Sequence, residues 1–449
     1  MIRILTLSVT LMLATISTVA QTYHEDDKEG LRMFLRQASA EEGKINAEQL
    51  GLAISDTLNW QTDEEWIAKI INLGWNNESP KRMIGIYDWG FKNIAGNLDI
   101  SKWSALAALD CSYNPLKELD VSANTALEVL ICSNNPLTAL DVSKNTALTY
   151  LSCQNNRLTT LDVSKNTALT YLRCPDNQLT ELDVSANTAL TDLNCDRNQL
   201  TALDVSKNTA LTRLTCSNNP LTALDVSKNT ALTYLSCQNN RLTTLDVSKN
   251  TALTYLVCFS NHLSLSDLFA ASENITMQNS KWLGTQNLLP QTVVIGSTID
   301  YSDQNIFNGT HTLFVVTKNN NPAPESDYTI TDGKITFTSL GKYTVTMTNE
   351  AIVSSEDYPA KVMIEVTVTE GTSIKTPAID AIQISPNPVS ESFHISGITE
   401  NTFVTISDIN GKTVLQSTIS PEEAVFVAHL PKGMYIVQVE GKTTKMIKN

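Results

Sequence analysis

Eight cysteines divide the middle of this 449-residue chain into equal intervals. Each lies 21 residues after the one before it, and the rest of the chain contains none. A fixed period of about 20–29 residues is typical of stacked structural repeats, which bury a continuous core only against their neighbours. The period therefore predicts a solenoid in this part of the chain. The cysteines are Cys111, Cys132, Cys153, Cys174, Cys195, Cys216, Cys237 and Cys258.

One repeat shows the pattern within a coil. The segment LTYLSCQNNRLTTLDVSKNTA begins at Leu148 and recurs unchanged from residue 232. Its first half fits the pattern L-x-x-L-x-L-x-x-N-x-L, with cysteine in the third leucine place. The fixed places are Leu148, Leu151, Cys153, Asn156 and Leu158. Over roughly residues 98–269 the chain resembles bacterial leucine-rich repeat proteins, and we expect a solenoid with a parallel β-sheet at residues 98–270.

Alternation along each coil predicts which side chains face the core. Side chains of a strand point alternately to its two faces, so Leu151 and Cys153 face inward while Tyr150 and Ser152 face outward. The second half of each coil reads L-x-x-L-x-V-x-x-N, so either edge is a candidate for the sheet. We favour the cysteine edge, because the Asp-Val-Ser-Lys-Asn-Thr-Ala run of the other edge is rich in turn-forming residues.

Two polar columns accompany the leucines. The asparagine that follows each cysteine by three places, such as Asn156, is predicted to turn inward and bond backbone groups of the bend. The repeated Asp-Val-Ser places an aspartate column on the other edge. This column either binds calcium or accepts hydrogen bonds from nearby backbone amides, and we favour the amides because such local bonding is common. The aspartates are Asp120, Asp141, Asp162, Asp183, Asp204, Asp225 and Asp246.

The even number of cysteines has three interpretations. A disulfide framework is one, but in-register parallel side chains point the same way and suit the bond poorly. A metal ladder is another, although the chain has no C-x-x-C pair. We favour free, buried thiols that act as small hydrophobic side chains. No cofactor is predicted.

The N-terminal region is predicted to contain two parts. Residues 1–20 have a positive start, an apolar run and a small-residue cleavage site, which is typical of a secretory signal peptide. Residues 21–97 are predicted to form a helical cap for the first coil, with an amphipathic helix that begins near Thr62. The alternative for this tryptophan-rich segment is an aromatic ligand groove. No later stretch is long and apolar enough for a transmembrane helix.

Short alternating strands follow the repeats. Residues 285–371 are predicted to form a β-sandwich of immunoglobulin-like type, and Asp332-Gly333 is a hairpin signal. Such modules commonly act as spacers, and this one carries no chemical signature. The predicted strands are 292–295, 312–317, 334–338, 343–348 and 362–369.

The last residues, 378–449, carry three further motifs. They are Pro386-Asn387-Pro388 at the start, Leu-Pro-Lys-Gly-Met-Tyr from Leu430 to Tyr435, and a basic tail from Lys445 to Asn449. In this order the motifs resemble the C-terminal sorting domain of proteins exported by the type IX secretion system of Bacteroidetes. The resemblance implies an all-β domain recognised by the outer-membrane secretion machinery, and a secreted or cell-surface location. A second plain β-sandwich is the alternative.

Composition and motifs limit the chemistry. The formal net charge of −15 argues against binding to a nucleic-acid backbone, which needs clustered lysine and arginine. The five histidines are scattered, and we find no H-E-x-x-H, G-x-S-x-G or phosphate-binding loop. We therefore predict a protein that is not an enzyme.

Solenoids commonly bind partners through a concave face. The outward positions carry two tyrosine pairs around a charged centre, and tyrosine and arginine are enriched at interface hot spots. We expect a recognition protein, with an adhesin- or internalin-like role, that binds a host or bacterial protein there. A structural spacer without a ligand and a glycan-binding protein are the alternatives. The candidate residues are Tyr150, Tyr171, Arg173, Asp192, Asn194, Asp196, Arg197, Arg213, Tyr234 and Tyr255.

Overall fold

The computed structural model describes residues 23–39, 41–50, 52, 73–86, 94, 98–273, 275, 280–370, 383–396, 398, 400–409, 411–421, 423–439 and 442–449. The chain divides into two compact units, residues 1–369 and 370–449. The predicted signal peptide and the helix expected near Thr62 lie outside the described residues.

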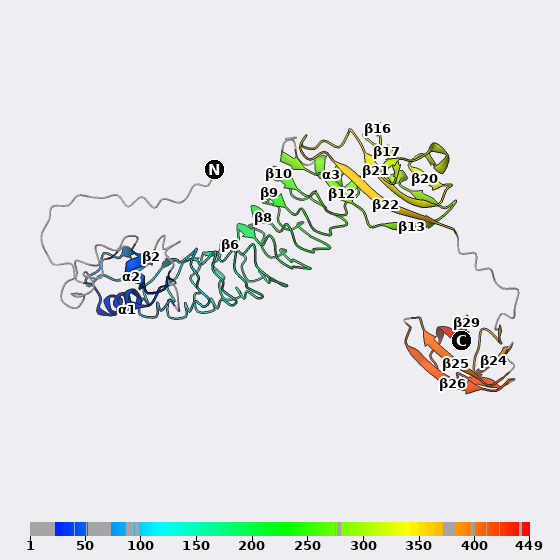
Figure 1. The fold of residues 1–449 in the computed structure, drawn as a ribbon, viewed down its shortest axis with the longest axis horizontal. Coiled ribbons are helices and arrows are strands. Elements are labelled where there is room, and N and C mark those ends of the chain that lie inside the picture. The colour runs from blue at the N-terminus through cyan, green and yellow to red at the C-terminus, as the bar shows by residue number, and fades with distance from the viewer. Residues whose placement is uncertain are drawn as a thin grey trace. The chain divides into compact units, whose positions relative to one another are not determined.

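Each 21-residue coil contributes one three-residue strand to a single sheet. These strands pair in parallel and in register, so that Leu151 lies opposite Leu130 on one side and Leu172 on the other. Figure 1 shows the coils stacked in chain order. The strands are β3 (Ala108–Asp110), β4 (Val129–Ile131), β5 (Tyr150–Ser152), β6 (Tyr171–Arg173), β7 (Asp192–Asn194), β8 (Arg213–Thr215), β9 (Tyr234–Ser236) and β10 (Tyr255–Val257).

The cysteine edge forms the sheet, as the turn-rich composition of the other edge predicts. The leucine two residues before each cysteine and the cysteine itself are fully buried in every coil. All eight cysteines are free, which confirms the prediction of buried thiols. The column therefore acts as core packing, since a free cysteine behaves as a small apolar side chain.

Two asparagine columns hold the bends of successive coils together. In one, Asn156 donates from Nδ2 to the backbone oxygens of Cys132 and Cys153, and its Oδ1 accepts from the amide of Leu137. The predicted inward turn of this column is confirmed. In the other, Asn166 donates to the oxygens of Val142 and Asn145. Asn156 thus supplies buried backbone groups of its own and the preceding coil with partners, and Asn166 supplies those of the preceding coil.

The described part of the N-terminal region contains strands as well as the predicted helix. It has the helices α1 (Glu25–Arg36) and α2 (Asn46–Gln49), but residues 73–86 contain the strands β1 (Leu73–Trp75) and β2 (Met83–Ile86). Strand β2 pairs in parallel with β3, so the solenoid sheet begins before the first cysteine. The helical reading was wrong here because strands of three or four residues carry too little periodicity to be distinguished from helix.

Helix α1 joins the same hydrophobic core through aromatic packing. Phe34 and the fully buried Trp103 have ring centroids 6.1 Å apart, and Trp103 donates its indole N–H to the backbone oxygen of Asp27. The carboxylate of Asp27, which is buried, receives two hydrogen bonds from the Arg82 guanidinium at 2.9 and 3.1 Å. This pairing offsets the cost of burying a charge.

The solenoid sheet continues past the last cysteine. Helix α3 (Leu265–Glu273) follows the last coil, and β11 (Lys281–Trp282) then pairs in parallel with β10. Gln286, which is fully buried, takes the place of the next asparagine: its Nε2 donates to the oxygens of Cys258 and Leu283, and its Oε1 accepts from the amide of Asn261. The asparagine column that includes Asn156 therefore ends with a glutamine.

Residues 285–369 form two larger sheets and one two-stranded sheet, and each of the five predicted strand regions contains a strand. Asp332 and Gly333 both have positive φ and connect β19 to β20, as the hairpin signal predicts. One sheet has β12 (Thr285–Asn287), β13 (Gln291–Val294), β17 (Leu313–Lys318), β18 (Asn321–Pro322), β21 (Gly341–Thr348) and β22 (Lys361–Thr369). The other has β14 (Thr298–Asp300), β19 (Tyr328–Thr331) and β20 (Lys334–Phe337), while β15 (Ile306–Phe307) pairs with β16 (Thr310–His311).

The second unit has its own hydrophobic core between two sheets. Its basic tail contacts both other motifs: Asn387 donates to the backbone oxygen of Lys445 and accepts from the amide of Ile447, and Tyr435 of the second motif lies opposite Met446 of the tail. The strands are β23 (Gln383–Ser385), β24 (Ser392–Ser396), β25 (Thr402–Asp408), β26 (Thr413–Ile419), β27 (Ala424–Phe426), β28 (Gly433–Val439) and β29 (Lys442–Lys448).

Candidate interaction face of the solenoid sheet

The outward side chains of β5 to β10, together with those of the turns that follow these strands, form a surface that we call the sheet face. Because the strands are in register, residues at equal places of successive coils lie side by side. The first outward place of β5 to β10 holds Tyr150, Tyr171, Asp192, Arg213, Tyr234 and Tyr255, and all six lie in one row. Residues at one position of the repeat are therefore neighbours in space and together form a continuous surface.

Tyrosines stack in pairs at both ends of this row. Tyr150 and Tyr171 have ring centroids 5.0 Å apart with 9° between their planes, and Tyr234 and Tyr255 lie 4.8 Å apart at 4°. These separations match the spacing of adjacent strands. The rings therefore cover one another's faces and direct their edges outward.

A charged pair separates the two tyrosine pairs. Nε of Arg213 lies 3.8 Å from Oδ2 of Asp192, and its guanidinium carbon lies 3.7 Å from the centroid of the Tyr234 ring. Arg213 therefore covers the face of Tyr234 that its tyrosine partner leaves free. Asp192 is 8% exposed, and this burial raises the pKa of its carboxyl despite hydrogen bonding to Tyr171 and the positive charge of Arg213.

Arg173 lies in the second outward row, half-buried between the tyrosine pair and the charged pair. Burial raises the pKa of Tyr150, while the charge of Arg173 and its hydrogen bond to the hydroxyl act in the opposite direction. Arg173 also acts electrostatically on Asp192. Arg173 thus interacts electrostatically with both Tyr150 and Asp192.

The other three predicted residues stabilise the turn next to the row. The side-chain oxygen of Asn194 accepts from the amide of Asp196, and Asp196 accepts from the amide of Ser217 at 2.7 Å. Burial raises the pKa of Asp196. Arg197 is exposed, has a φ of 50°, and lies 3.3 Å from Oδ1 of Asp176. These contacts fix the surface, and Arg197 extends it at the rim.

Ser152 faces outward but is buried. Its position faces outward as predicted, but the residue is only 4% exposed and lies 2.8 Å from the hydroxyl of Ser133. A small side chain on a closely spaced sheet is covered by larger neighbours on the next strands, which alternation alone does not predict. Outward and exposed are therefore different properties on this face.

Sequence reasoning missed three aromatic residues that extend the sheet face. Trp282 lies 5.7 Å from Tyr255, Tyr358 lies 4.7 Å from Trp282, and Phe259 lies 4.9 Å from Tyr358. Phe259 was detectable because it follows Val257 by two places and so shares the outward phase. Trp282 and Tyr358 lie outside the repeat, where the 21-residue period gives no signal.

The aspartate column lies on the opposite edge, away from the sheet. Each carboxylate accepts from the amide of the serine two residues later, as Asp162 does from Ser164 at 2.8 Å. This geometry agrees with the amide-bonding interpretation. Among the described residues, no group of three or more histidine, cysteine, aspartate or glutamate side chains is placed to hold a metal ion.

Comparisons with known proteins match two parts of the chain. Residues 383–449 match the family model of a secretion system C-terminal sorting domain, and residues 125–166 match a model of leucine-rich repeats in two copies. No curated protein matches the chain. Among the described residues, no helix has both the length and the apolar character needed to cross a membrane.

Several solved structures are similar to parts of the chain. One is the functional domain of InlJ from Listeria monocytogenes, described as including a cysteine ladder (27% identity, 60% of this chain, 73% of that chain, TM-score 0.31). Another is the internalin InlF from Listeria monocytogenes (19%, 62%, 81%, 0.37), and a third is a plant ice-binding protein (20%, 60%, 89%, 0.43). All three TM-scores are below 0.5, so these likenesses add nothing to the repeat architecture described above.

Coils of 21 residues that stack buried leucine, cysteine and asparagine columns beneath a parallel sheet define a leucine-rich repeat solenoid. The chain is a secreted leucine-rich repeat protein that carries a type IX secretion C-terminal sorting domain. Its destination is the cell surface or the exterior.

Proposed function

We propose that this protein is a non-enzymatic recognition protein that binds a protein partner through the sheet face. The observation that carries the proposal is the row of stacked tyrosines around the Asp192–Arg213 pair. Rigid aromatic side chains lose little conformational entropy on binding, and tyrosine and arginine dominate interface hot spots. The partner is a host or bacterial protein met outside the cell.

The closed ring faces favour a protein over a glycan. Sugar recognition by aromatic residues uses an open ring face, whereas Tyr234 has Tyr255 on one face and Arg213 on the other. The exposed parts of these residues are ring edges and hydroxyl groups, which suit contacts with polar and apolar groups of a protein surface.

The flanking regions support this role. We infer that residues 21–97 cap the first coil, because Phe34 and Trp103 extend the solenoid core and Asn114 accepts from the amide of Ile94. We also infer an immunoglobulin-like module at residues 285–371. Residues 378–449 bring the chain to the type IX machinery, and residues 1–20 are the expected export signal.

A set of four substitutions tests the sheet face. Tyr150→Ala, Tyr171→Ala, Arg173→Ala and Arg213→Ala together should weaken binding of a partner captured with the wild-type chain by at least about tenfold, measured by biolayer interferometry. A matched control removes the same charge from exposed positions outside the strands: Lys165→Ala, Lys207→Ala, Thr180→Ala and Thr201→Ala. Normal binding by the sheet-face variant, with circular dichroism showing an intact fold, would reject the proposal. A glycan array with the wild-type chain tests the alternative ligand class.

A further inference from the structure

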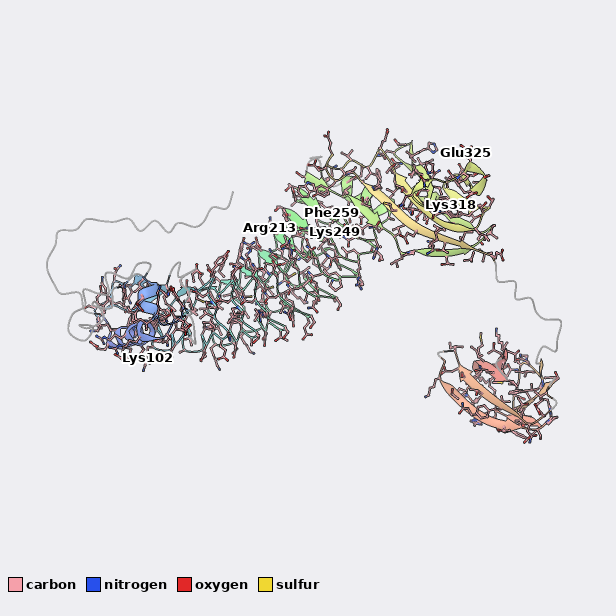
Figure 2. The ribbon with its side chains drawn as sticks, in the orientation of Figure 1. Lys102, Arg213, Lys249, Phe259, Lys318 and Glu325 are labelled. Atoms are coloured by element: carbon pink, nitrogen blue, oxygen red, sulfur yellow. The ribbon has the colours of Figure 1, made fainter. Side chains whose placement is uncertain are left out.

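The aromatic row of the sheet face continues beyond the solenoid. Tyr234, Tyr255, Trp282, Tyr358 and Phe259 form an unbroken run of rings with successive centroid separations of 4.8, 5.7, 4.7 and 4.9 Å. We call these five residues the aromatic ledge. Figure 2 labels Arg213, which lies next to the first ring of the ledge, and Phe259, near the end of the solenoid that meets residues 285–369, which we call the all-β region. Each of the five side chains is half-buried and so contributes to the surface.

Tyr358 comes from the all-β region, in the loop between β21 and β22, and its backbone is held against the solenoid. Its carbonyl oxygen accepts from the amide of Gly284 at 3.1 Å and from the hydroxyl of Ser354 at 2.6 Å. The amide of Tyr358 donates to the oxygen of Ser355. A loop residue with this many backbone partners is pre-positioned, so a partner need not order it on binding.

The stacking determines what the ledge presents to a ligand. Tyr358 lies between Trp282 at 12° and Phe259 at 15°, so both of its faces are covered, as are those of Tyr234. An aromatic ring is electron-rich on its face and positive at its edge. Where both faces are covered and the edges point outward, at Tyr234 and Tyr358, the ledge attracts oxygen acceptors and apolar groups and leaves no open ring face for a cation or a sugar ring.

We propose that the aromatic ledge is the anchoring part of the interaction face, and that the all-β region is a component of the binding surface through Tyr358. The occupant is a protein segment with apolar side chains that pack on the ring edges. Its carbonyl or carboxylate oxygens face the tyrosine hydroxyls and Arg213. This inference rests on the proposed function of the sheet face and names the chemistry of its partner.

A displayed library of random peptides, selected on the mature full chain, supplies the probe. Enriched peptides should contain apolar and acidic residues, and Tyr358→Ala and Tyr255→Ala should each weaken their binding by about tenfold or more. The control is Leu340→Ala, which removes an exposed apolar side chain elsewhere in the all-β region and should leave binding unchanged. Peptide binding should also slow hydrogen exchange at residues 281–285 and 354–358 of the wild-type chain, a readout that does not depend on the folding of any variant.

The results separate this inference from the proposed function. One outcome would contradict the ledge but agree with the proposed sheet face. In that outcome, Tyr150→Ala and Arg173→Ala abolish peptide binding, Tyr358→Ala binds the peptides normally, and the peptides do not slow hydrogen exchange at residues 354–358. Peptides insensitive to every one of these substitutions would overturn both. Absence of any enrichment over an unrelated protein, or binding on a glycan array that Tyr358→Ala abolishes, would contradict the stated chemistry of the ledge.

Discussion

At the scale of single residues, asparagine holds consecutive coils together. Nδ2 of the fully buried Asn187 donates to the backbone oxygens of Val163 at 3.0 Å and Asn166 at 2.8 Å, both in the corresponding bend of the preceding coil. These carbonyls are buried where water cannot replace the amide. Each bond is therefore more costly to lose than a surface hydrogen bond.

Replacement of Asn187 by alanine should lower the free energy of unfolding by about 1–3 kcal/mol, because two buried carbonyl oxygens each lose one donor and keep only a backbone amide as partner. Urea denaturation followed by circular dichroism measures the loss. The control is Thr188→Ala at the next, exposed position, which should change the free energy by less than about 0.5 kcal/mol. Similar losses for the two variants would contradict the role given to the asparagine.

Leucine at the inward strand position is the second residue-scale test. Leu151→Ala should cost about 2–5 kcal/mol of stability, since the side chain is fully buried between two identical neighbours and its removal leaves a cavity. Thr159→Ala at an exposed place of the same coil serves as the control. Thermal denaturation compares them, and an equal change in the two midpoints would show that the inward register is wrong.

At the scale of elements, the aspartate edge makes stability depend on pH. The backbone amide of Ser164 donates to Asp162 and holds the pKa of its carboxyl below the ordinary value, and Ser206 does the same for Asp204. A carboxyl whose pKa is lower in the folded state adds stability above its unfolded pKa of about 3.9 and loses it as the pH falls through the folded pKa.

The free energy of unfolding should therefore fall as the pH drops below about 4. Asp141→Asn, Asp162→Asn and Asp204→Asn together should make this fall shallower, because asparagine still accepts the serine amide but does not titrate. Urea midpoints measured from about pH 6 to about pH 3 give the slope.

Asp192 provides a comparison of opposite sign. Burial raises the pKa of its carboxyl, so its contribution to stability increases as the pH falls from the folded pKa toward the unfolded value. Asp192→Asn removes this contribution, which partly offsets the destabilisation of the chain in acid. The free energy of unfolding should therefore fall more steeply with decreasing pH than in the wild-type chain. A shallower loss would mean that the Asp192 carboxyl is not buried as described.

The junction between solenoid and all-β region depends on one glycine. Gly284 has a φ of 56°, and a Cβ at this position would overlap the Cβ of Phe259. Gly284→Ala should destabilise the chain by more than Gly296→Ala, which has a φ of 82° but no atom within 4 Å of the added Cβ. In both variants an alanine at positive φ costs about 1 kcal/mol, so the two variants differ only in the overlap of the added Cβ with Phe259. The difference in thermal midpoint isolates that term.

At the scale of the whole molecule, the features that belong to the repeat were predictable from the sequence, and several others were not. The period and its alternation predicted the sheet edge, the buried cysteines and the tyrosine row, because the residue type at each of these coil positions recurs in several repeats. The strands β1 and β2 and the contribution of Tyr358 were not predictable, since each occurs once and depends on contacts between distant segments. Tertiary packing, rather than local pattern, placed them.

The same reasoning limits what could be predicted of the interaction face. Alternation gave the outward direction of Arg213 and Asp192, but their pairing and the cover over Tyr234 follow from the register of neighbouring strands. Charge and ring stacking on this face are therefore properties of several coils together.

The most direct test of the account is the reactivity of the eight cysteines. They are fully buried, and desolvation raises the pKa of Cys153 and Cys237 to about 12, so few thiolates exist near neutral pH. Treatment of the native mature chain with iodoacetamide, followed by intact-mass spectrometry, should show no adducts, while the same treatment in guanidinium chloride should label every cysteine. Rapid labelling of several cysteines in the native chain would contradict the stacked-coil core on which the sheet face depends.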